Sequence, residues 1–282
     1  MAQPSVRCWF SFLVSFSMPE FQEKAVLVRR EAITANIIRL TLKAPQISVH
    51  ARPGQFVMVR IGSGADPLLR RPFSIHQVLA DATLQVLFKV VGQGTELLAR
   101  CQVGETLDCL GPLGRGFTGY DSGQGRRFCL VGGGMGIAPL YFLARRIQQR
   151  AQAPEKHVVL LGGRTRDEVA LFEEEFLALG CRVHVATDDG SMGYHGLVPD
   201  LLPDVLQSRC AVFTCGPLPM MQTVASLAER AACPCQVSLE THMACGLGAC
   251  LGCALAARNK SGYIHVCKEG PVFDAGEVAW PQ

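Results

Sequence analysis

Residues 131–139 read Val-Gly-Gly-Gly-Met-Gly-Ile-Ala-Pro and continue an apolar, strand-like run that begins at residue 128. A strand that turns through glycines into a helix is typical of α/β domains, where backbone N–H groups approach a pyrophosphate and the helix N-terminus stabilises its charge. The run does not match the G-x-G-x-x-G spacing of ordinary dehydrogenases. It therefore favours a dinucleotide site that belongs to a different lineage of nucleotide-binding proteins. A turn required only for tight packing is the alternative. The candidate cofactor contacts are Gly132, Gly133, Gly134 and Gly136.

The chain on the C-terminal side of this turn alternates between helix-like and strand-like patterns. Because strands that alternate with helices form a parallel sheet with helices on both faces, we expect an α/β nucleotide-binding domain over residues 126–235. The expected strands are 128–131, 157–161, 182–186 and 211–214, and the expected helices are 138–150, 167–179, a short one near 197–206, and 219–231.

The N-terminal side has a different pattern, with short alternating runs separated by Gly, Pro and Asp. Such period-two alternation predicts an antiparallel barrel or sandwich over residues 21–120. In it, Arg71-Pro72-Phe73-Ser74 precedes Gly92-Gln93-Gly94-Thr95. A guanidinium for a phosphate, an aromatic ring for a flat heterocycle and a nearby hydroxyl form a candidate flavin site. The alternatives are a solvated charge at Arg71 and a core ring at Phe73.

The C-terminal segment, residues 236–282, is rich in Gly and Cys and is too small to form a core of its own without a metal centre. Its cysteines follow the C-x4-C-x2-C spacing with a distant fourth Cys, which is the spacing of plant-type 2Fe-2S ligation. A four-cysteine zinc site is the alternative, although only one pair fits the usual C-x2-C spacing. Cys233 and Cys235 form a C-x-C that fits no ligand pattern. The candidate metal ligands are Cys245, Cys250, Cys253 and Cys267.

Composition excludes several classes of protein. Of the 282 residues, 49% are hydrophobic and 18% charged, and the formal net charge is +3, which argues against disorder, a membrane-spanning chain and a nucleic-acid-binding protein. The odd count of 13 Cys argues against a disulfide framework and for a reducing cytoplasm. Residues 1–20 read as a disordered extension with Met18 as an alternative start, because the short apolar run near residue 8 lacks a signal-peptidase site.

Taken in order, these motifs resemble the ferredoxin–NADP reductase superfamily. A barrel with Arg71-Pro72-Phe73-Ser74, a glycine-rich turn into a helix, and the late Cys215-Gly216-Pro217 carry the likeness. The C-terminal cysteines, the stretch Leu-Arg-Arg-Pro-Phe-Ser-Ile at residues 69–75 and Gly-Pro-Val-Phe at 270–273 narrow it. Over residues 22–275 the chain is similar to the electron-transfer subunits of two-subunit, NAD-dependent dihydroorotate dehydrogenases.

The resemblance implies FAD in the barrel, NAD on the α/β domain and a 2Fe-2S cluster near a partner subunit. In the first domain it implies that Arg71 holds FAD phosphate beside Pro72, that Phe73 takes the place of the Tyr of many relatives against the flavin, and that Ser74 lies near flavin nitrogen 5. The remaining residues that it implies are Gly94 and Thr95 at the FAD pyrophosphate, Asp189 in a loop open to the nucleotide, and Cys215 near the nicotinamide.

It also implies a function and a partner. Dihydroorotate would be oxidised in a catalytic subunit, in pyrimidine biosynthesis, and electrons would pass through the cluster and FAD to NAD+, in a heterotetramer of two plus two subunits. One alternative is a subunit of another flavin and iron–sulfur enzyme, such as an NADH-dependent ferredoxin:NADP+ oxidoreductase, a sulfide dehydrogenase or a hydrogenase. Another is a zinc-binding, redox-sensing interaction protein. Arg164 and Arg166 leave NADH and NADPH both open, since either arginine would suit a 2′-phosphate or be a plain surface charge.

Overall fold

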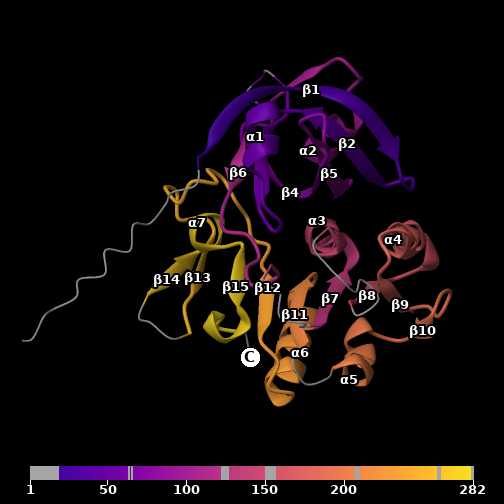
Figure 1. The fold of residues 1–282 in the computed structure, drawn as a ribbon. Helices are drawn as coiled ribbons and strands as arrows, with labels where there is room; N and C mark the ends of the chain where they lie inside the picture. Colours follow the sequence, from indigo (N-terminus) through magenta and orange to yellow (C-terminus); the bar gives the residue numbers. More distant parts are fainter. Residues whose placement is uncertain are drawn as a thin grey trace, which may run out of the picture.

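The computed structural model describes residues 19–62, 64, 66–121, 127–149, 157–206, 210–258 and 262–280. The predicted N-terminal extension, with the alternative start Met18, falls outside these ranges except for residues 19 and 20. The described chain forms an upper barrel, a lower sheet flanked by helices, and a C-terminal segment that lies beside both (Figure 1).

The N-terminal part is a closed, six-stranded antiparallel barrel in the order β1-β2-β5-β4-β3-β6. Alternation along β1 places Ala25 and Leu27 in the barrel core while their neighbours face solvent, as period-two patterning requires. The strands are β1 (Phe21–Ala32), β2 (Ile37–Lys43), β3 (Phe56–Arg60), β4 (Arg71–Val78), β5 (Thr83–Lys89) and β6 (Thr106–Leu113), with two short helices, α1 (Pro45–His50) and α2 (Gln93–Arg100).

The second part is a seven-stranded sheet in the order β10-β9-β8-β7-β11-β12-β15. Its first six strands are parallel, and successive residues of β7 pack on opposite faces, with Leu130 toward α3 and α4 and Val131 toward α6. The strands are β7 (Arg127–Gly133), β8 (Val158–Gly163), β9 (Arg182–Thr187), β10 (Tyr194–His195), β11 (Cys210–Cys215) and β12 (Cys235–Ser238), and the helices are η1 (Gly134–Gly136), α3 (Ile137–Gln148), α4 (Arg166–Ala178), η3 (Val198–Leu201), α5 (Leu202–Val205) and α6 (Leu218–Arg230).

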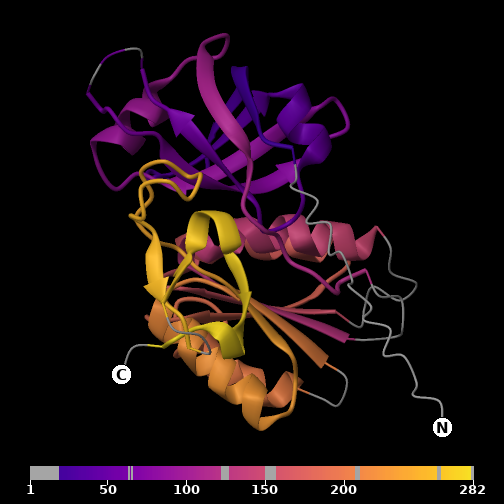
Figure 2. The ribbon, with the colours of Figure 1, turned by 90° about the vertical axis from the view of Figure 1, so that its left-hand side faces the viewer.

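The C-terminal segment is joined to this sheet. Its strand β15 (Val272–Asp274) pairs antiparallel with β12, so the predicted domain boundary at residue 235 falls at the start of a strand that both parts share. A two-stranded hairpin and a short helix lie next to β15, below the barrel (Figure 1, Figure 2). These elements are β13 (Ala254–Ala256), β14 (Tyr263–His265) and α7 (Val266–Glu269), and η4 (Ala275–Glu277) follows β15.

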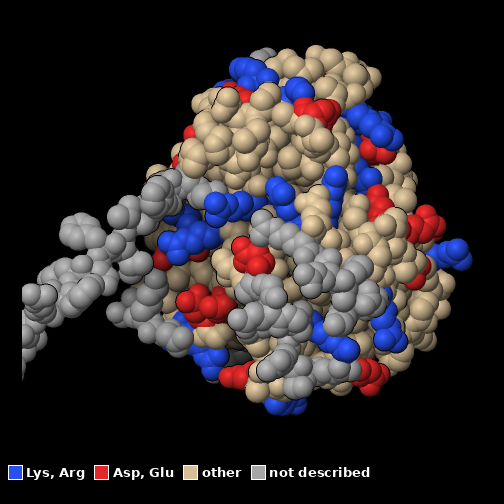
Figure 3. Space-filling view, viewed as in Figure 1, with Lys and Arg blue, Asp and Glu red and all other residues tan. Residues whose placement is uncertain are grey.

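Polar contacts hold the barrel against the side of the sheet that α3 and α4 cover. Helix α3 lies against β4, where the buried His76 bonds through Nδ1 to the carbonyl of Ala138 at 3.1 Å. Arg39 of β2 reaches α4 and pairs with Glu175 at 2.5 Å. On the face shown in Figure 3, Lys and Arg side chains gather where the barrel meets the rest of the molecule. The parts of the chain that are described include no helix long and apolar enough to cross a membrane.

Candidate functional site

A cavity of about 370 Å³ lies where the three parts of the molecule meet. The barrel contributes the predicted flavin motif to its wall, the nucleotide domain contributes the start of α3, and the C-terminal segment contributes the chain that leads to the cysteines. The lining residues that matter below are Arg71, Pro72, Phe73, Ser74, Lys89 and Thr95 from the barrel, Met135 and Ala138 from the second part, and Ser238, Glu240, Thr241 and Met243 from the third.

The predicted phosphate contacts Arg71 and Gly94 are brought together at the start of α2. A Cβ on Gly94 would lie 3.0 Å from Nε of Arg71, so the absence of a side chain lets the guanidinium lie against the first turn of the helix. Arg71 donates from Nη1 to the carbonyl of Leu69 at 2.7 Å. The hydroxyl of Thr95 accepts the N–H of Val91 at 2.9 Å and donates to the carbonyl of Gly92, so Thr95 shapes the turn.

The ring and the hydroxyl of the flavin motif lie on neighbouring positions of β4. Phe73 is 7% exposed and packs on Phe88 with ring centroids 5.3 Å apart, while it also lines the cavity. Ser74 pairs with Phe56 of β3 and lies at the cavity wall. Phe73 is therefore a core residue whose ring is also available to a flat ligand.

The glycine-rich turn is packed against the end of the neighbouring strand. A Cβ on Gly136 would lie 2.5 Å from the backbone nitrogen of Gly216 and closer still to the carbonyl of Cys215. Gly134 has a φ of +53°, a left-handed conformation that favours glycine. The turn therefore brings α3 against the Cys-Gly-Pro stretch, so both motifs of the nucleotide domain form one surface at the carboxyl ends of β7 and β11.

Cys215 is fully buried and pairs in register with Gly132 on one side and Ser238 on the other. Burial, reinforced by the charge of Glu240, raises the pKa of the Cys215 thiol well above its usual range. Its register partner Ser238 and the nearby Glu240 line the cavity, and the sequence motifs did not mark either as a cofactor contact. Burial also raises the pKa of Glu240.

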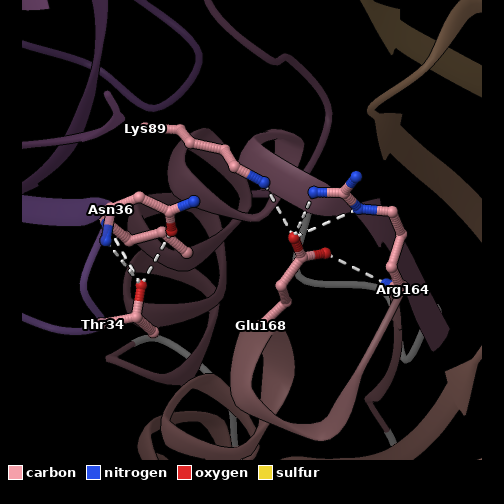
Figure 4. Close-up of polar contacts among 6 residues, drawn as sticks. Thr34, Asn36, Lys89, Arg164 and Glu168 are labelled. Atoms are coloured by element: carbon pink, nitrogen blue, oxygen red, sulfur yellow. Dashed lines mark hydrogen bonds and ion pairs between the residues drawn. The ribbon is translucent and has the colours of Figure 1, made fainter. Parts of the chain in front are cut away.

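The predicted nucleotide loop with Asp189 lies at the carboxyl end of β9. Asp189 accepts the N–H of Ser191 at 2.9 Å and its hydroxyl at 2.6 Å, and these bonds lower the pKa of its carboxyl. Arg164, at the end of β8, is bound by Glu168 of α4, and Lys89 of the barrel binds the same carboxylate (Figure 4). The Asp189 carboxylate thus accepts hydrogen bonds from within its own loop, and Arg164 is paired with Glu168.

The four predicted metal ligands lie in one region of the C-terminal segment and form two pairs. Sγ atoms of Cys253 and Cys267 are 3.2 Å apart and both residues are buried. Cys245 is half-buried and Cys250 is exposed. Burial opposes ionisation of Cys245, but N–H groups of Leu247 and Cys250 directed at its sulfur outweigh this and lower its pKa to about 6.

The chain around these thiols suits an iron–sulfur cluster. Backbone N–H groups point at the sulfurs, as from Gly248 to Cys267 at 3.1 Å, and such bonds orient and tune cluster ligands. Gly246, with a φ of +75°, packs on Met58 of β3, where a Cβ would lie 2.6 Å from Cγ of Met58. Within the described ranges, no three His, Cys, Asp or Glu side chains meet as a metal-binding group, and the four cysteines stay predicted ligands.

The cavity likewise suits a flavin. It offers the guanidinium of Arg71 at one end, the ring of Phe73 along one wall, and the hydroxyl of Thr241, a buried oxygen with no hydrogen-bond partner in the described part of the chain. A buried polar group without a partner is costly unless a ligand supplies one.

Three known families match successive parts of the chain. The oxidoreductase FAD-binding domain matches residues 24–117, and the oxidoreductase NAD-binding domain matches residues 130–226. The iron–sulfur cluster binding domain of dihydroorotate dehydrogenase B matches residues 240–279. These ranges follow the barrel, the sheet and the C-terminal segment, so the FAD, NAD and iron–sulfur domains predicted from the sequence are confirmed.

Solved structures share this architecture. That of an NADH-dependent reduced ferredoxin-NADP oxidoreductase has a TM-score of 0.80 and 29% identity, and the match covers 92% of this chain and 90% of that one. The ferredoxin NADP+ reductase from Neisseria gonorrhoeae has the same fold at 19% identity, with a TM-score of 0.62 over 75% of this chain and 91% of its own.

Curated relatives are similar over nearly the whole chain. The dihydroorotate dehydrogenase B (NAD(+)) electron transfer subunit of Bacillus caldolyticus is 41% identical over 259 residues, covering 91% of this chain and 98% of that protein. The corresponding subunit of Enterococcus faecalis (strain ATCC 700802 / V583) is 39% identical over 93% of this chain and 99% of its own. Because the likeness extends through the cysteine-rich segment as well as both nucleotide domains, the chain belongs to the family of dihydroorotate dehydrogenase B (NAD(+)) electron transfer subunits.

Proposed function

We propose that this chain carries electrons from dihydroorotate, oxidised in a separate catalytic subunit, through a 2Fe-2S cluster and FAD to NAD+. The single observation that supports this most strongly is the shared cavity, whose walls come from the flavin motif, the start of α3 and the chain that leads to the cysteines. A flavin held there lies between an iron–sulfur segment and a nucleotide domain, which is the order that the proposed electron path requires.

The chemistry of transfer comes from the cofactors, because a flavin exchanges single electrons with a cluster and a hydride with nicotinamide. The protein residues bind and orient. Arg71 and the first turn of α2 hold the FAD phosphates, Phe73 contacts the ring system, Ser74 and Thr241 offer hydroxyls to its polar edge, and the glycines of the turn before α3 admit the NAD pyrophosphate. The proposed ligands of the cluster are Cys245, Cys250, Cys253 and Cys267.

A Cys250→Ser variant tests the path. We expect the purified variant to lose the visible absorbance and the electron paramagnetic resonance signal of the cluster, and the complex to lose dihydroorotate-to-NAD+ turnover. NADH oxidation with an artificial dye at the flavin should persist. Cys101→Ser is the matched control, since Cys101 lies in the barrel at the end of α2. Retained turnover in a cluster-free Cys250→Ser complex would refute the path.

The solved oxidoreductase at 29% identity favours a second candidate, a subunit of an NADH-dependent ferredoxin:NADP+ oxidoreductase. Anaerobic purification with native partners, followed by mass spectrometry, separates the two. A co-purifying catalytic subunit that oxidises dihydroorotate supports the first proposal, and a subunit that reduces ferredoxin supports the second. We further propose that the complex is a cytoplasmic heterotetramer of two plus two subunits, which native mass spectrometry tests directly.

A further inference from the structure

The carboxylate of Glu168 binds two positively charged side chains, which come from different parts of the molecule. It accepts Nη2 of Arg164 at 2.9 Å and Nε at 3.3 Å, and it accepts Nζ of Lys89 from the barrel at 2.8 Å. The second carboxylate oxygen accepts the backbone N–H of Arg164 at 3.0 Å. Figure 4 shows the three side chains converging from β5, from the residue after β8 and from the first turn of α4. Arg164 is thereby fixed although its side chain is largely exposed.

This cluster lies where the adenosine half of a dinucleotide must pass. Gly133, at the end of β7, pairs in register with Gly162 of β8, and Arg164 is the first residue beyond β8. A dinucleotide whose pyrophosphate sits at the turn after β7 extends its adenosine ribose along the carboxyl edge of the sheet, over the adjacent strand. In such sites an acidic residue accepts the ribose 2′-hydroxyl, whereas a free arginine accommodates a 2′-phosphate.

The charge around Arg164 is unsuited to a 2′-phosphate as the chain is folded. Nε and Nη2 of its guanidinium donate to Glu168, and this bonding, together with the charge of Asp188 in the neighbouring loop, raises the pKa of Arg164. A phosphate that entered would have to displace a carboxylate from Arg164 and lie among acidic groups. A neutral 2′-hydroxyl meets no such obstacle, because it carries no charge for these carboxylates to repel.

We infer that Glu168 sets the choice of nucleotide, and that by holding Arg164 it makes this chain select NADH and NAD+ over their 2′-phosphorylated forms. The inference rests on the proposed function, because it concerns the same nucleotide site. Removing the negative charge of Glu168 leaves Arg164 and Lys89 as two cations without their carboxylate, at the edge of the sheet that the ribose crosses. The site then has the two positive charges of Arg164 and Lys89, and a guanidinium that can donate two hydrogen bonds to a phosphate monoester.

The test compares Glu168→Gln with Glu174→Gln, an exposed carboxylate elsewhere on α4 that gives the same change in net charge. Gln at residue 168 keeps an acceptor for the backbone N–H of Arg164, so the start of α4 is preserved. Dissociation constants for NADH, NADPH, 5′-AMP and 2′,5′-ADP are measured by calorimetry on the intact protein. We expect Glu168→Gln to raise the affinity for NADPH relative to that for NADH by about tenfold or more, which is the scale of one charge-assisted contact. Glu174→Gln should leave this ratio unchanged.

Arg164→Leu supplies a second test that needs no change at Glu168. In the wild-type background it should weaken NADH and NADPH equally or not at all, and in the Glu168→Gln background it should abolish the gain in NADPH binding. A wild-type protein that binds both nucleotides equally, an unchanged ratio in Glu168→Gln, or an Arg164→Leu variant that loses NADPH binding selectively would overturn the inference. Failure of the wild-type protein to bind NADH and 5′-AMP would instead refute the proposed nucleotide function.

Discussion

Gly136 occupies a position in which a side chain has no room. Its neighbours at the missing Cβ are backbone atoms of Cys215 and Gly216, at the end of β11, and backbone cannot move aside as the tip of a long side chain can. The glycine thus sets the distance between the turn before α3 and the strand that ends in Cys215. Packing alone therefore requires a glycine at residue 136, and contact of this turn with a nucleotide stays a prediction.

We therefore expect Gly136→Ala to lower the free energy of unfolding by at least about 1–3 kcal/mol, the usual cost of forcing atoms into a filled space. Nucleotide binding should weaken at the same time, because the turn is displaced from β11. Urea denaturation and NADH calorimetry measure the two effects. Gly276→Ala is the control, since no atom lies within 4 Å of its added Cβ. Equal stability of the two variants would show that the turn yields easily.

Single residues differ in how well the sequence predicted their place. Arg71 and Gly94 were expected at one phosphate site, and the structure does bring them together, because each lies in a local motif. Glu240 and Lys89 line the same cavity without having been predicted there. No spacing in the sequence identifies them, since their approach depends on how the barrel, the sheet and the C-terminal segment pack, which is a property of the whole fold.

Helix α4 is tied to the barrel at two points, two turns apart. Glu168 reaches Lys89 of β5, and Glu175 reaches Arg39 of β2. A spacing of seven residues places both carboxylates on one face of the helix. Arg39 is 7% exposed, so its ion pair with Glu175 lies within the interface and is poorly screened by solvent.

Arg39→Met should lower the free energy of unfolding by about 3–5 kcal/mol, because it leaves the Glu175 carboxylate without its partner inside the interface. The double variant Arg39→Met/Glu175→Leu should recover most of that loss, because no charge then remains buried. Urea denaturation of the two single variants and the double variant measures the coupling. A double variant as unstable as Arg39→Met alone would mean that the interface depends on shape rather than on charge.

His76 makes the stability of this interface depend on pH. Burial, together with the positive charge of Arg39, lowers the pKa of His76 from 6.5 to about 3. Below about pH 6.5, His76 therefore binds a proton in the unfolded chain but not in the folded chain. As the pH falls from about 6.5 toward 3, this difference lowers the free energy of unfolding.

His76→Gln removes this contribution and keeps an N–H donor for the carbonyl of Ala138. Relative to the variant, the wild-type protein should lose up to about 1.4 kcal/mol of unfolding free energy for each pH unit below 6.5. Denaturation from pH 7 to pH 4 measures the difference between the two proteins. If the two stability curves run parallel, His76 does not have the lowered pKa.

The order of the barrel strands and of the main elements of the α/β part was predictable because these elements have strong local patterns. Period-two runs identified the barrel strands, and the glycine-rich turn identified the start of the α/β part. The antiparallel strand β15 was not expected in the sheet. Its three residues are too few to show a period, and its pairing with β12 is a long-range contact. Local patterns thus predicted the layers, and the join between the second and third parts depended on tertiary packing.

On the scale of the whole molecule, the C-terminal segment touches both other parts. It pairs with the sheet through β15, bridges to the barrel at Arg115 and Pro271, and packs Gly246 on Met58. Two of these three contacts, through β15 and Pro271, lie outside the loop of the predicted cluster cysteines, residues 245–253, and the third, at Gly246, lies within it.

Removal of iron by an anaerobic chelator should accordingly loosen only that loop. We expect backbone amides of residues 245–253 to exchange hydrogen faster by mass spectrometry, since a bound cluster would tie the cysteines of this loop to Cys267. Amides of β15 should keep their protection because β12 holds them, and β2 in the barrel is the internal reference. Uniform loss of protection over residues 240–274 would show that the cluster holds the whole segment in place.

The cavity also has a consequence for biosynthesis. Domains generally fold from the N-terminus as the chain is made, so the barrel with Arg71 and Phe73 is complete early. Ser238, Glu240, Thr241 and Met243, which also line the cavity, are translated long after Arg71 and Phe73. A nascent chain would therefore present Arg71 and Phe73 before the later residues of the cavity exist, so we expect firm FAD binding only after residue 243 has been made and the C-terminal segment has packed.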